Sequence, residues 1–329
     1  MTGFSIKPTR LKLWLISLGV LVGICGLFFQ LFYTAAKNEA IEQMSDELAL
    51  YAKQASLGIE DYFLLWKNTL SSLAQVEDVR DLTPGGKRLL GVFFEAHKDQ
   101  IRSITRTDAQ GVITYSFPNV TVVGTDISSQ SHVRAIMTHH EPVISAVFTS
   151  VQGQHVTAIH VPIFKSGVYD GSIAVTIDFQ TLAARFLAII RIGATGHAWV
   201  VSREGLELFN PQPGHVGRPA DESYAHCPSI KPLLAAMLAG HSGLTSFSCT
   251  ENDKRPREIA QLAAYRPIRL GNTYWAVAVS RAQSEELSGL TTFMRHLTVL
   301  LLSVFLFGLS ALYLIIKAWF AIKENATYK

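Results

Sequence analysis

Apolar residues recur every three or four positions over a long stretch that begins near Ala35 and continues to about Val79. This spacing places them on one face of an α-helix, and charged residues such as Glu39 and Glu47 fall on the opposite face. The pattern predicts a helix over residues 35–80, roughly 68 Å long. A helix of this length must pack against other parts of the protein or against a second copy of itself. We interpret it as a stalk on which two modules dock, with a plain dimeric coiled coil as the alternative. The apolar positions are Ile41, Met44, Leu48, Tyr51, Ala55, Ile59, Tyr62, Trp66, Leu70, Leu73 and Val76.

Both ends of the chain carry uncharged apolar segments that are long enough to cross a bilayer. Residues 13–33 are 21 positions without a charge, and residues 297–316 are another 20. The pattern predicts transmembrane helices over 13–33 and 297–320. A cleaved signal peptide competes for the first segment, with Thr34-Ala35-Ala36 as a weak cleavage site. Because the apolar core of a signal peptide is only about 7 to 15 residues long, we favour an uncleaved anchor.

Basic residues flank the outer end of each apolar segment, and this asymmetry predicts the orientation in the membrane. Three of them precede the first segment and three follow the second: Lys7, Arg10, Lys12, Lys317, Lys323 and Lys329. The positive-inside rule then places residues 1–12 and the short tail 321–329 in the cytoplasm. Residues 35–295 are expected outside it, so the chain is predicted to be a two-pass membrane protein.

The external region repeats one order of elements twice. Residues 104–126 and 197–219 each read as a strand, a polar turn, a second strand and a further turn. The tight turns need positive φ angles, which glycine adopts at little cost. The matched turn positions are Gly111 and Gly205, Pro118 and Pro211, and Gly124 and Gly217. The elements that follow are also matched: helices 132–139 and 230–239, strands 156–163 and 259–268, and closing strands 172–179 and 274–280.

The repeat predicts an α+β fold with two antiparallel sheets of about five strands each. We expect a distal module over residues 81–188 and a proximal module over residues 189–283. Pro84-Gly85-Gly86 is expected to end the stalk helix, with a short helix over 87–98 leading into the first strand. A connecting helix over 284–296 is expected to join the proximal module to the second transmembrane helix.

This order of elements resembles the double Cache family of extracellular sensor domains, over residues 13–320. The most specific local match is Gly193-Ala-Thr-Gly196-His-Ala-Trp-Val-Val-Ser-Arg-Glu-Gly205, which looks like the opening of a membrane-proximal module. Gly171-Ser-Ile-Ala-Val-Thr-Ile-Asp-Phe looks like the last strand of a distal module. The resemblance implies two PAS-like modules in tandem on one long helix, flanked by two transmembrane helices. It also implies a bacterial inner-membrane protein whose external region is periplasmic.

The resemblance implies that a small molecule binds in the distal module. Family members that bind amino acids carry an arginine and an aspartate as charged anchors, and here Gln130 and Thr176 stand at those places. Amino acids are therefore not expected as ligands through the usual motif. Arg134 and two imidazoles suggest a small organic acid, since charged donors form strong hydrogen bonds to carboxylates. The candidate ligand-binding residues are Tyr115, Gln130, His132, Arg134, Ser145, His160 and Thr176.

Two of the three cysteines are predicted to be bridged. Cys25 lies inside an apolar segment, and Cys227 and Cys249 form a pair in the external region. Outside a reducing cytosol such a pair favours a disulfide, with two unpaired buried thiols as the alternative. His132 and His139 lie seven residues apart on one helical face, which permits a pH-sensing pair or a shared metal. We predict no metal site and no cofactor.

Several classes of function lack support in the sequence. A net charge of +3 without a basic stripe argues against nucleic acid as a partner. The sequence contains no phosphate-binding loop, nucleophile elbow or metalloprotease helix, so no enzyme activity is predicted.

The expected function is that of a chemoreceptor or two-component sensor. Ligand binding would shift a conformational balance and pass the signal through the second transmembrane helix to a cytoplasmic or membrane partner. A homodimer through the stalk helix is also expected. The competing hypothesis is a membrane-anchored adaptor that binds another protein, for which the distal module would have a filled core and no cavity.

Overall fold

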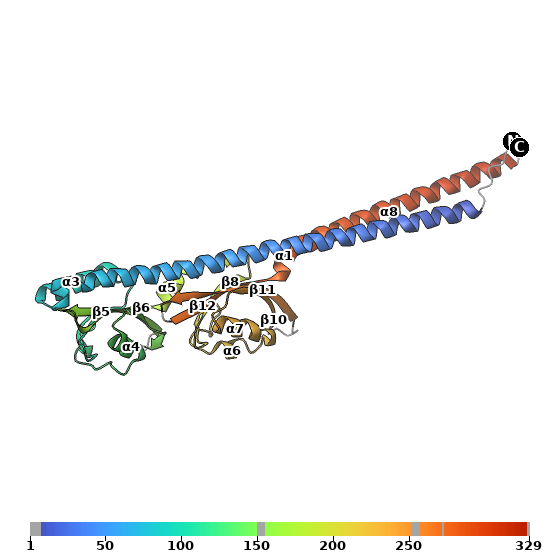
Figure 1. Cartoon of the computed structure of the whole chain (residues 1–329). Coiled ribbons are helices and arrows are strands. Elements are labelled where there is room, and N and C mark those ends of the chain that lie inside the picture. Colours follow the sequence, from blue (N-terminus) through green and yellow to red (C-terminus); the bar gives the residue numbers. More distant parts are fainter. Residues whose placement is uncertain (1–7, 150–154, 252–256, 272, 328–329) are drawn as a thin grey trace. The chain divides into compact units, whose positions relative to one another are not determined.

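The computed structural model describes residues 8–149, 155–251, 257–271 and 273–327. The chain divides into two compact units. One contains the described residues up to Met44 together with those from Ser284 onward, and the other is Ser45–Gln283. The fold is α+β, with long helices at both ends and two antiparallel sheets between them (Figure 1).

Two helices are long and apolar enough to cross a membrane. They lie within α1 (Pro8–Ala74) and α8 (Gln283–Thr327). Large apolar side chains of both are exposed, for example Phe28 at 72% and Phe307 at 76%. Neither helix breaks at the boundary that the sequence suggested: the first apolar segment continues into the stalk, and the expected connecting helix continues into the second apolar segment.

The stalk ends earlier than the sequence predicted. Helix α1 ends at Ala74, and a separate turn of helix, α2 (Glu77–Arg80), follows. Pro84 does not terminate a helix but begins the next one, α3 (Pro84–His97). Proline is tolerated at the first position of a helix because its missing N–H would be unpaired there anyway. The side chain of Thr83 caps this helix by accepting a hydrogen bond from the backbone N–H of Gly86 at 3.1 Å.

The distal module contains a six-stranded antiparallel sheet with the order β2-β1-β6-β5-β3, in which β4 also pairs with β5. Helix α4 (Ser131–His139) covers one face of it, η1 (Val120–Val122) follows β2, and α5 (Phe179–Phe186) follows β6 (Figure 1). The strands are β1 (Ser103–Thr107), β2 (Ile113–Phe117), β3 (Val143–Ile144), β4 (Phe148–Thr149), β5 (His155–Lys165) and β6 (Val168–Asp178).

The proximal module contains a second six-stranded sheet with the order β10-β11-β12-β8-β7, in which β9 pairs with β8. Helices α6 (Ala220–Ser223) and α7 (Lys231–Leu238) lie on one face, with η2 (Pro228–Ile230) before α7 (Figure 1). The strands are β7 (Arg191–Ile192), β8 (Gly196–Ser202), β9 (Glu207–Phe209), β10 (Gly243–Glu251), β11 (Arg257–Leu270) and β12 (Thr273–Ala282).

The two modules repeat one another down to single hydrogen bonds. Gly111 and Gly205 both have positive φ, at 86° and 84°. The carbonyl of Gly111 accepts from Ile127 N at 3.0 Å, and that of Gly205 accepts from Ala220 N at 2.9 Å. The sequence repeat therefore reflects a structural duplication.

Residues 45–74 of α1 pack against both modules. Phe63 meets Trp275 of β12 with ring centroids 5.4 Å apart, and Tyr62 meets Phe186 at 5.7 Å. Ser56 Oγ donates to the carbonyl of Pro267 at 2.7 Å. The apolar face of this helix is thus covered within the chain itself, which agrees with the stalk interpretation.

Candidate functional site

One face of the distal sheet carries a row of small and polar side chains. Ser103 of β1 pairs with Thr176 of β6, and Thr176 pairs in turn with Ala158 of β5. The next row consists of Thr105, Ala174 and His160. Because side chains alternate between the two faces of a strand, these residues all point to the same side.

This face forms the floor of a cavity of about 270 Å³. Gln130 and His132 contribute from the segment that begins α4, and Phe148 contributes from β4. Of the candidates chosen from sequence, four line the cavity: Gln130, His132, His160 and Thr176.

Two imidazoles meet in the cavity wall. The ring of His132 stacks on Phe148 with centroids 4.8 Å apart and lies 5.0 Å from the ring of His160. Nδ1 of His160 is 3.2 Å from the hydroxyl of Ser172. Burial lowers the pKa of His132 to about 4 and that of His160 well below its usual value. Both rings are therefore neutral at pH 7, and each offers one N–H donor.

Arg102 is the one cationic side chain among the described residues that line the cavity. It precedes β1, and its backbone N–H donates to the carbonyl of Thr176 at 2.7 Å, which places it beside the polar row. Its Nη2 and Nε donate to Oδ2 of Asp178 at 2.6 and 3.2 Å. The Arg102 side chain is 47% exposed, so the ion pair lies at the edge of the cavity.

The other three candidates lie elsewhere. Tyr115 neighbours Ser116 on β2 and so points to the opposite face, where its hydroxyl donates to the Lys87 carbonyl at 3.1 Å. Arg134 is exposed, and its Nη2 donates to the carbonyl of Ser129 at 3.0 Å. Two residues along a helix correspond to about 200°, which explains why Arg134 turns away from the cavity while His132 faces it.

Ser145 has a structural role. Its hydroxyl donates to the carbonyl of Ala146 at 2.7 Å and accepts from the backbone N–H of Ala158 at 2.8 Å. Both partners belong to the backbone, so this side chain joins the end of β3 to β5.

Sequence reasoning missed several polar residues of the wall. They are Arg102, Ser103, Thr105, Ser116, Asn119 and Thr125. The alternation of side chains along β6 shows which β6 residues share a face with Thr176. It cannot show which β1 residues share that face, because Ser103 and its partner Thr176 are 73 residues apart in the sequence.

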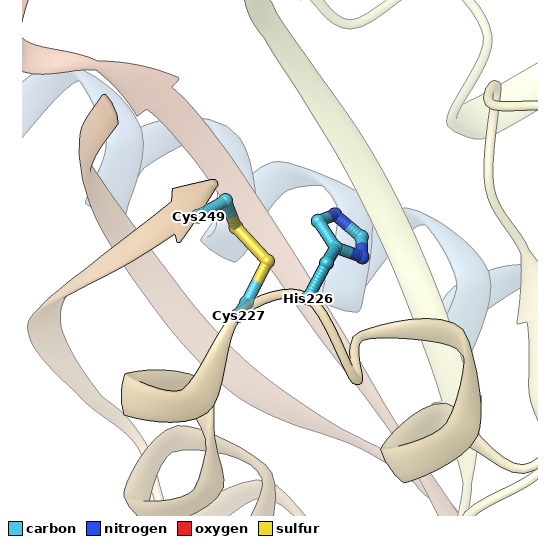
Figure 2. Close-up of side chains that lie close together, drawn as sticks. All are labelled: His226, Cys227 and Cys249. Atoms are coloured by element: carbon cyan, nitrogen blue, oxygen red, sulfur yellow. A yellow bond between two sulfur atoms is a disulfide. The ribbon is translucent and has the colours of Figure 1, made fainter. Parts of the chain in front are cut away.

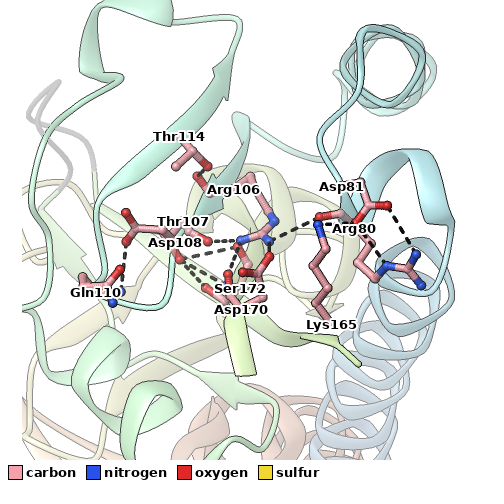
Figure 3. A network of polar contacts seen from close by, with 10 residues as sticks. All are labelled: Arg80, Asp81, Arg106, Thr107, Asp108, Gln110, Thr114, Lys165, Asp170 and Ser172. Carbon is pink, nitrogen blue, oxygen red and sulfur yellow. Dashed lines mark hydrogen bonds and ion pairs between the residues drawn. The ribbon is translucent and has the colours of Figure 1, made fainter. Parts of the chain in front are cut away.

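A dense polar network lies where the end of β1 meets the start of β6 (Figure 3). Arg106 follows Thr105 and thus points away from the cavity; its guanidinium is nearly fully buried. Its Nη2 donates to Oδ2 of Asp170 at 2.8 Å. Thr107 and Ser172 lie on the cavity side of the sheet, and their hydroxyls are 2.9 Å apart. Burial lowers the pKa of Arg106, while the charge of Asp170 opposes that shift. These contacts hold β1 against β6 on both faces of the sheet.

In the proximal module, Cys227 and Cys249 form a disulfide, as the sequence predicted (Figure 2). It joins the loop after α6 to β10, with Cα atoms 4.2 Å apart. His226 lies beside the disulfide. A ring nitrogen of His226 and the two sulfur atoms lie within 4.8 Å of one another. Because the sulfurs are bonded to each other, they are not thiolate ligands in this state.

A family model described as Cache domain matches residues 32–290. The chain belongs to the Cache domain family. The match spans the stalk and both modules, which agrees with the double Cache arrangement of two sheets on one long helix. The similar structures are described as ligand-binding or extracellular domains of receptors and of a histidine kinase.

Solved Cache structures share this fold. The ligand-binding domain of the Pseudomonas fluorescens chemoreceptor CtaA in complex with L-isoleucine has a TM-score of 0.59 at 18% identity, with 77% of this chain and 98% of that chain covered. The extracellular domain of the histidine kinase mmHK1S-Z2 has a TM-score of 0.54 at 16% identity, covering 75% and 99%. An extracellular ligand binding receptor from Desulfohalobium retbaense has a TM-score of 0.52 at 16% identity, covering 71% of this chain and 40% of that chain. A search of curated proteins found no match.

Proposed function

We propose that this Cache protein is a two-pass membrane sensor that binds a small molecule in the distal cavity. The observation that carries the proposal is the convergence of polar groups from β1, β5, β6 and α4 on one cavity with an otherwise apolar wall. Such a combination is typical of small-molecule sites. The similar CtaA domain is described in complex with L-isoleucine, which supports a small-molecule role for the fold.

The ligand class that fits best is a small organic acid held by Arg102. Arg134, the anchor suggested by sequence, lies outside the cavity, whereas the guanidinium of Arg102 reaches its edge. The neutral rings of His132 and His160 supply N–H donors without adding charge. A zwitterionic amino acid would need an anionic anchor for its ammonium group, and the uncharged Thr176 stands where amino-acid-binding members of the family carry an aspartate.

The proposed topology places both termini in the cytoplasm and residues 35–295 in the periplasm, in the inner membrane of a bacterium. Strand β12 ends at Ala282 and α8 begins at the next residue, so a shift of the sheet has a direct covalent route into the second apolar helix. A chemotaxis or two-component partner would read that shift. A ligand can shift the equilibrium between two conformations of the protein only through the difference in its affinity for them.

We also propose that the protein is a homodimer through the exposed face of the stalk. Leu50, Leu57 and Leu64 lie seven residues apart, and their side chains are 53%, 41% and 48% exposed. A seven-residue spacing of leucines is typical of a coiled-coil seam. The face of the stalk that packs on the modules is not available for this contact.

A thermal-shift titration of the full chain in nanodiscs tests the ligand proposal. The probes are propionate, succinate and L-isoleucine, and the matched variants are Arg102→Gln and Arg134→Gln, which remove the same charge at positions inside and outside the cavity. A ligand that binds only the folded state stabilises it by about 2.7 kcal/mol at one hundred times its Kd. We expect a carboxylate to raise the melting temperature of the wild type and of Arg134→Gln but not of Arg102→Gln.

Two outcomes would contradict the proposal. Equal shifts in both variants would exclude Arg102 as the anchor. If none of the probes, and none of a wider panel of carboxylates, amines and purines, shifts a well-folded protein, the adaptor hypothesis would replace the sensor hypothesis.

A further inference from the structure

The proximal module contains its own cavity, of about 400 Å³, on the face equivalent to the distal one. Ser280 of β12 pairs with His197 of β8 in the way that Thr176 pairs with Ser103 in the distal module. Both His197 and Ser280 line the proximal cavity. The duplication therefore gave the chain two cavities on corresponding sheet faces.

The centre of the proximal face is filled by aromatic side chains, and this displaces its cavity. Trp199 is fully buried two residues after His197, where the distal module has the small Thr105. The ring of Trp199 lies 5.1 Å from that of Tyr224. The open space is left toward the ends of β10 and β11, where Phe247 and Gln261 line it.

A buried carboxylate lies behind the wall of this cavity. Glu207 is fully buried, and its Oε1 accepts a hydrogen bond from Asn210 Nδ2. The same amide donates to the hydroxyl of Tyr224 at 2.8 Å, and Tyr224 lines the cavity. Oε2 of Glu207 lies 3.3 Å from Nδ1 of His215, which adds a positive charge only in its protonated form.

The negative charge of Glu207 affects the pKa values of two residues in the cavity wall, Tyr224 and His197. It contributes, after burial, to raising the pKa of the Tyr224 hydroxyl well above its usual value. Burial lowers the pKa of His197, and Glu207 weakly opposes that shift. Among the described lining residues there is no lysine or arginine. A buried carboxylate close to a cavity attracts positive charge to it.

We propose that the proximal cavity binds a small organic ammonium ion. Tyr224 and Phe247 contribute aromatic rings to the wall, which suit a cation, and the side-chain amides of Gln212 and Gln261 offer oxygen acceptors for N–H groups. Ser280 lies in the cavity wall three residues before α8 begins, so an occupant would contact the strand that continues into that helix. This site is separate from the distal cavity and does not depend on its ligand.

Isothermal titration of the full chain in nanodiscs with 1,4-diaminobutane tests this site, with succinate as the anion of matched length. Thr250 is exposed and lines the cavity, so Thr250→Arg and Thr250→Glu add opposite charges at one position without disturbing the core. Glu207→Gln removes the buried charge and keeps its shape. Glu204→Gln, in the exposed turn before β9, makes the same change in net charge elsewhere.

We expect the wild type and Glu204→Gln to bind the diamine equally. Glu207→Gln and Thr250→Arg are expected to weaken binding about tenfold or more, and Thr250→Glu to preserve or strengthen it. The proposal is overturned if the wild type does not bind the diamine, or if Thr250→Arg and Thr250→Glu bind it with the same affinity. It is also overturned if succinate binds in its place and more tightly to Thr250→Arg. The Thr250 pair keeps the test decisive even if Glu207→Gln does not fold.

Discussion

Ile113 and Glu207 occupy the same position in the two modules. Ile113 pairs with Thr107 and accepts a backbone hydrogen bond from Gly124 N; Glu207 pairs with Val201 and accepts one from Gly217 N, both at 2.8 Å. In the distal module the position is an apolar part of a cavity whose edge carries Arg102. In the proximal module it is a buried carboxylate. The duplicated position thus carries an apolar side chain in one module and a buried acidic one in the other.

The stability of the distal module is expected to fall between pH 6.5 and pH 4. The folded-state pKa of His132, about 4, lies below the unfolded value of 6.5, so protonation favours the unfolded chain. Above pH 6.5 His132 does not affect the free energy of unfolding. Below that pH the free energy of unfolding decreases, by about 2 kcal/mol at pH 5. His160, whose pKa is lowered in the same direction, adds to it.

Melting curves at pH 7 and pH 5 for wild type, His132→Gln and His139→Gln check this expectation. His132→Gln should reduce the pH dependence. His139, exposed at the end of the same helix, serves as the control and should leave it unchanged. The assignment to His132 fails if both variants retain the full wild-type pH dependence.

Reduction of the Cys227–Cys249 disulfide is expected to destabilise the proximal module. The bridge closes a loop with a sequence separation of 22. Constraining a loop of this length stabilises a fold by about 3 kcal/mol, chiefly by limiting the unfolded chain. Cys227→Ser with Cys249→Ser should lower the melting temperature followed by tryptophan fluorescence.

A matched control uses the free cysteine. Cys25 is exposed in the first apolar segment, and Cys25→Ser should leave both the melting temperature and its sensitivity to a dithiol reductant unchanged. An unchanged melting temperature in the double variant would show that the bridge adds no stability.

Substitution of the exposed stalk leucines is expected to weaken the dimer without unfolding the chain. Leu57→Lys places a charge at the centre of the Leu50, Leu57 and Leu64 seam, where it would face its symmetry mate. Light scattering of the solubilised protein should show a shift from dimer to monomer. Lys53→Leu removes a charge from the same exposed face, three residues after Leu50, and should preserve or strengthen the dimer. A dimer that persists in Leu57→Lys would place the interface elsewhere.

The sequence identified a good part of the distal site, and the reasons for success and failure are physical. Thr176 and His160 could be predicted because strand alternation is a local property, and His132 because it opens an amphipathic helix. The sequence suggested Arg134 as a cationic donor, but the structure places Arg134 outside the cavity and Arg102 at its edge. Which arginine lies at the cavity depends on the side of α4 that faces the sheet and on the pairing of β1 with β6. Neither can be predicted from neighbouring residues in the sequence.

The sequence alone determined the two apolar segments, the duplicated order of strands, the glycine turns and the cysteine pair. Each follows from composition or spacing over a few tens of residues, where the physics of bilayers, strands and turns leaves few alternatives. Only the tertiary structure decided which polar groups converge. The fully buried Glu207 resembles any surface glutamate in sequence, and its role arises from pairing with β8 and packing against Tyr224 and His215. Such contacts join distant segments of the chain. Burial strengthens the electrostatic interactions of the Glu207 carboxylate because the protein interior has a lower dielectric constant than water.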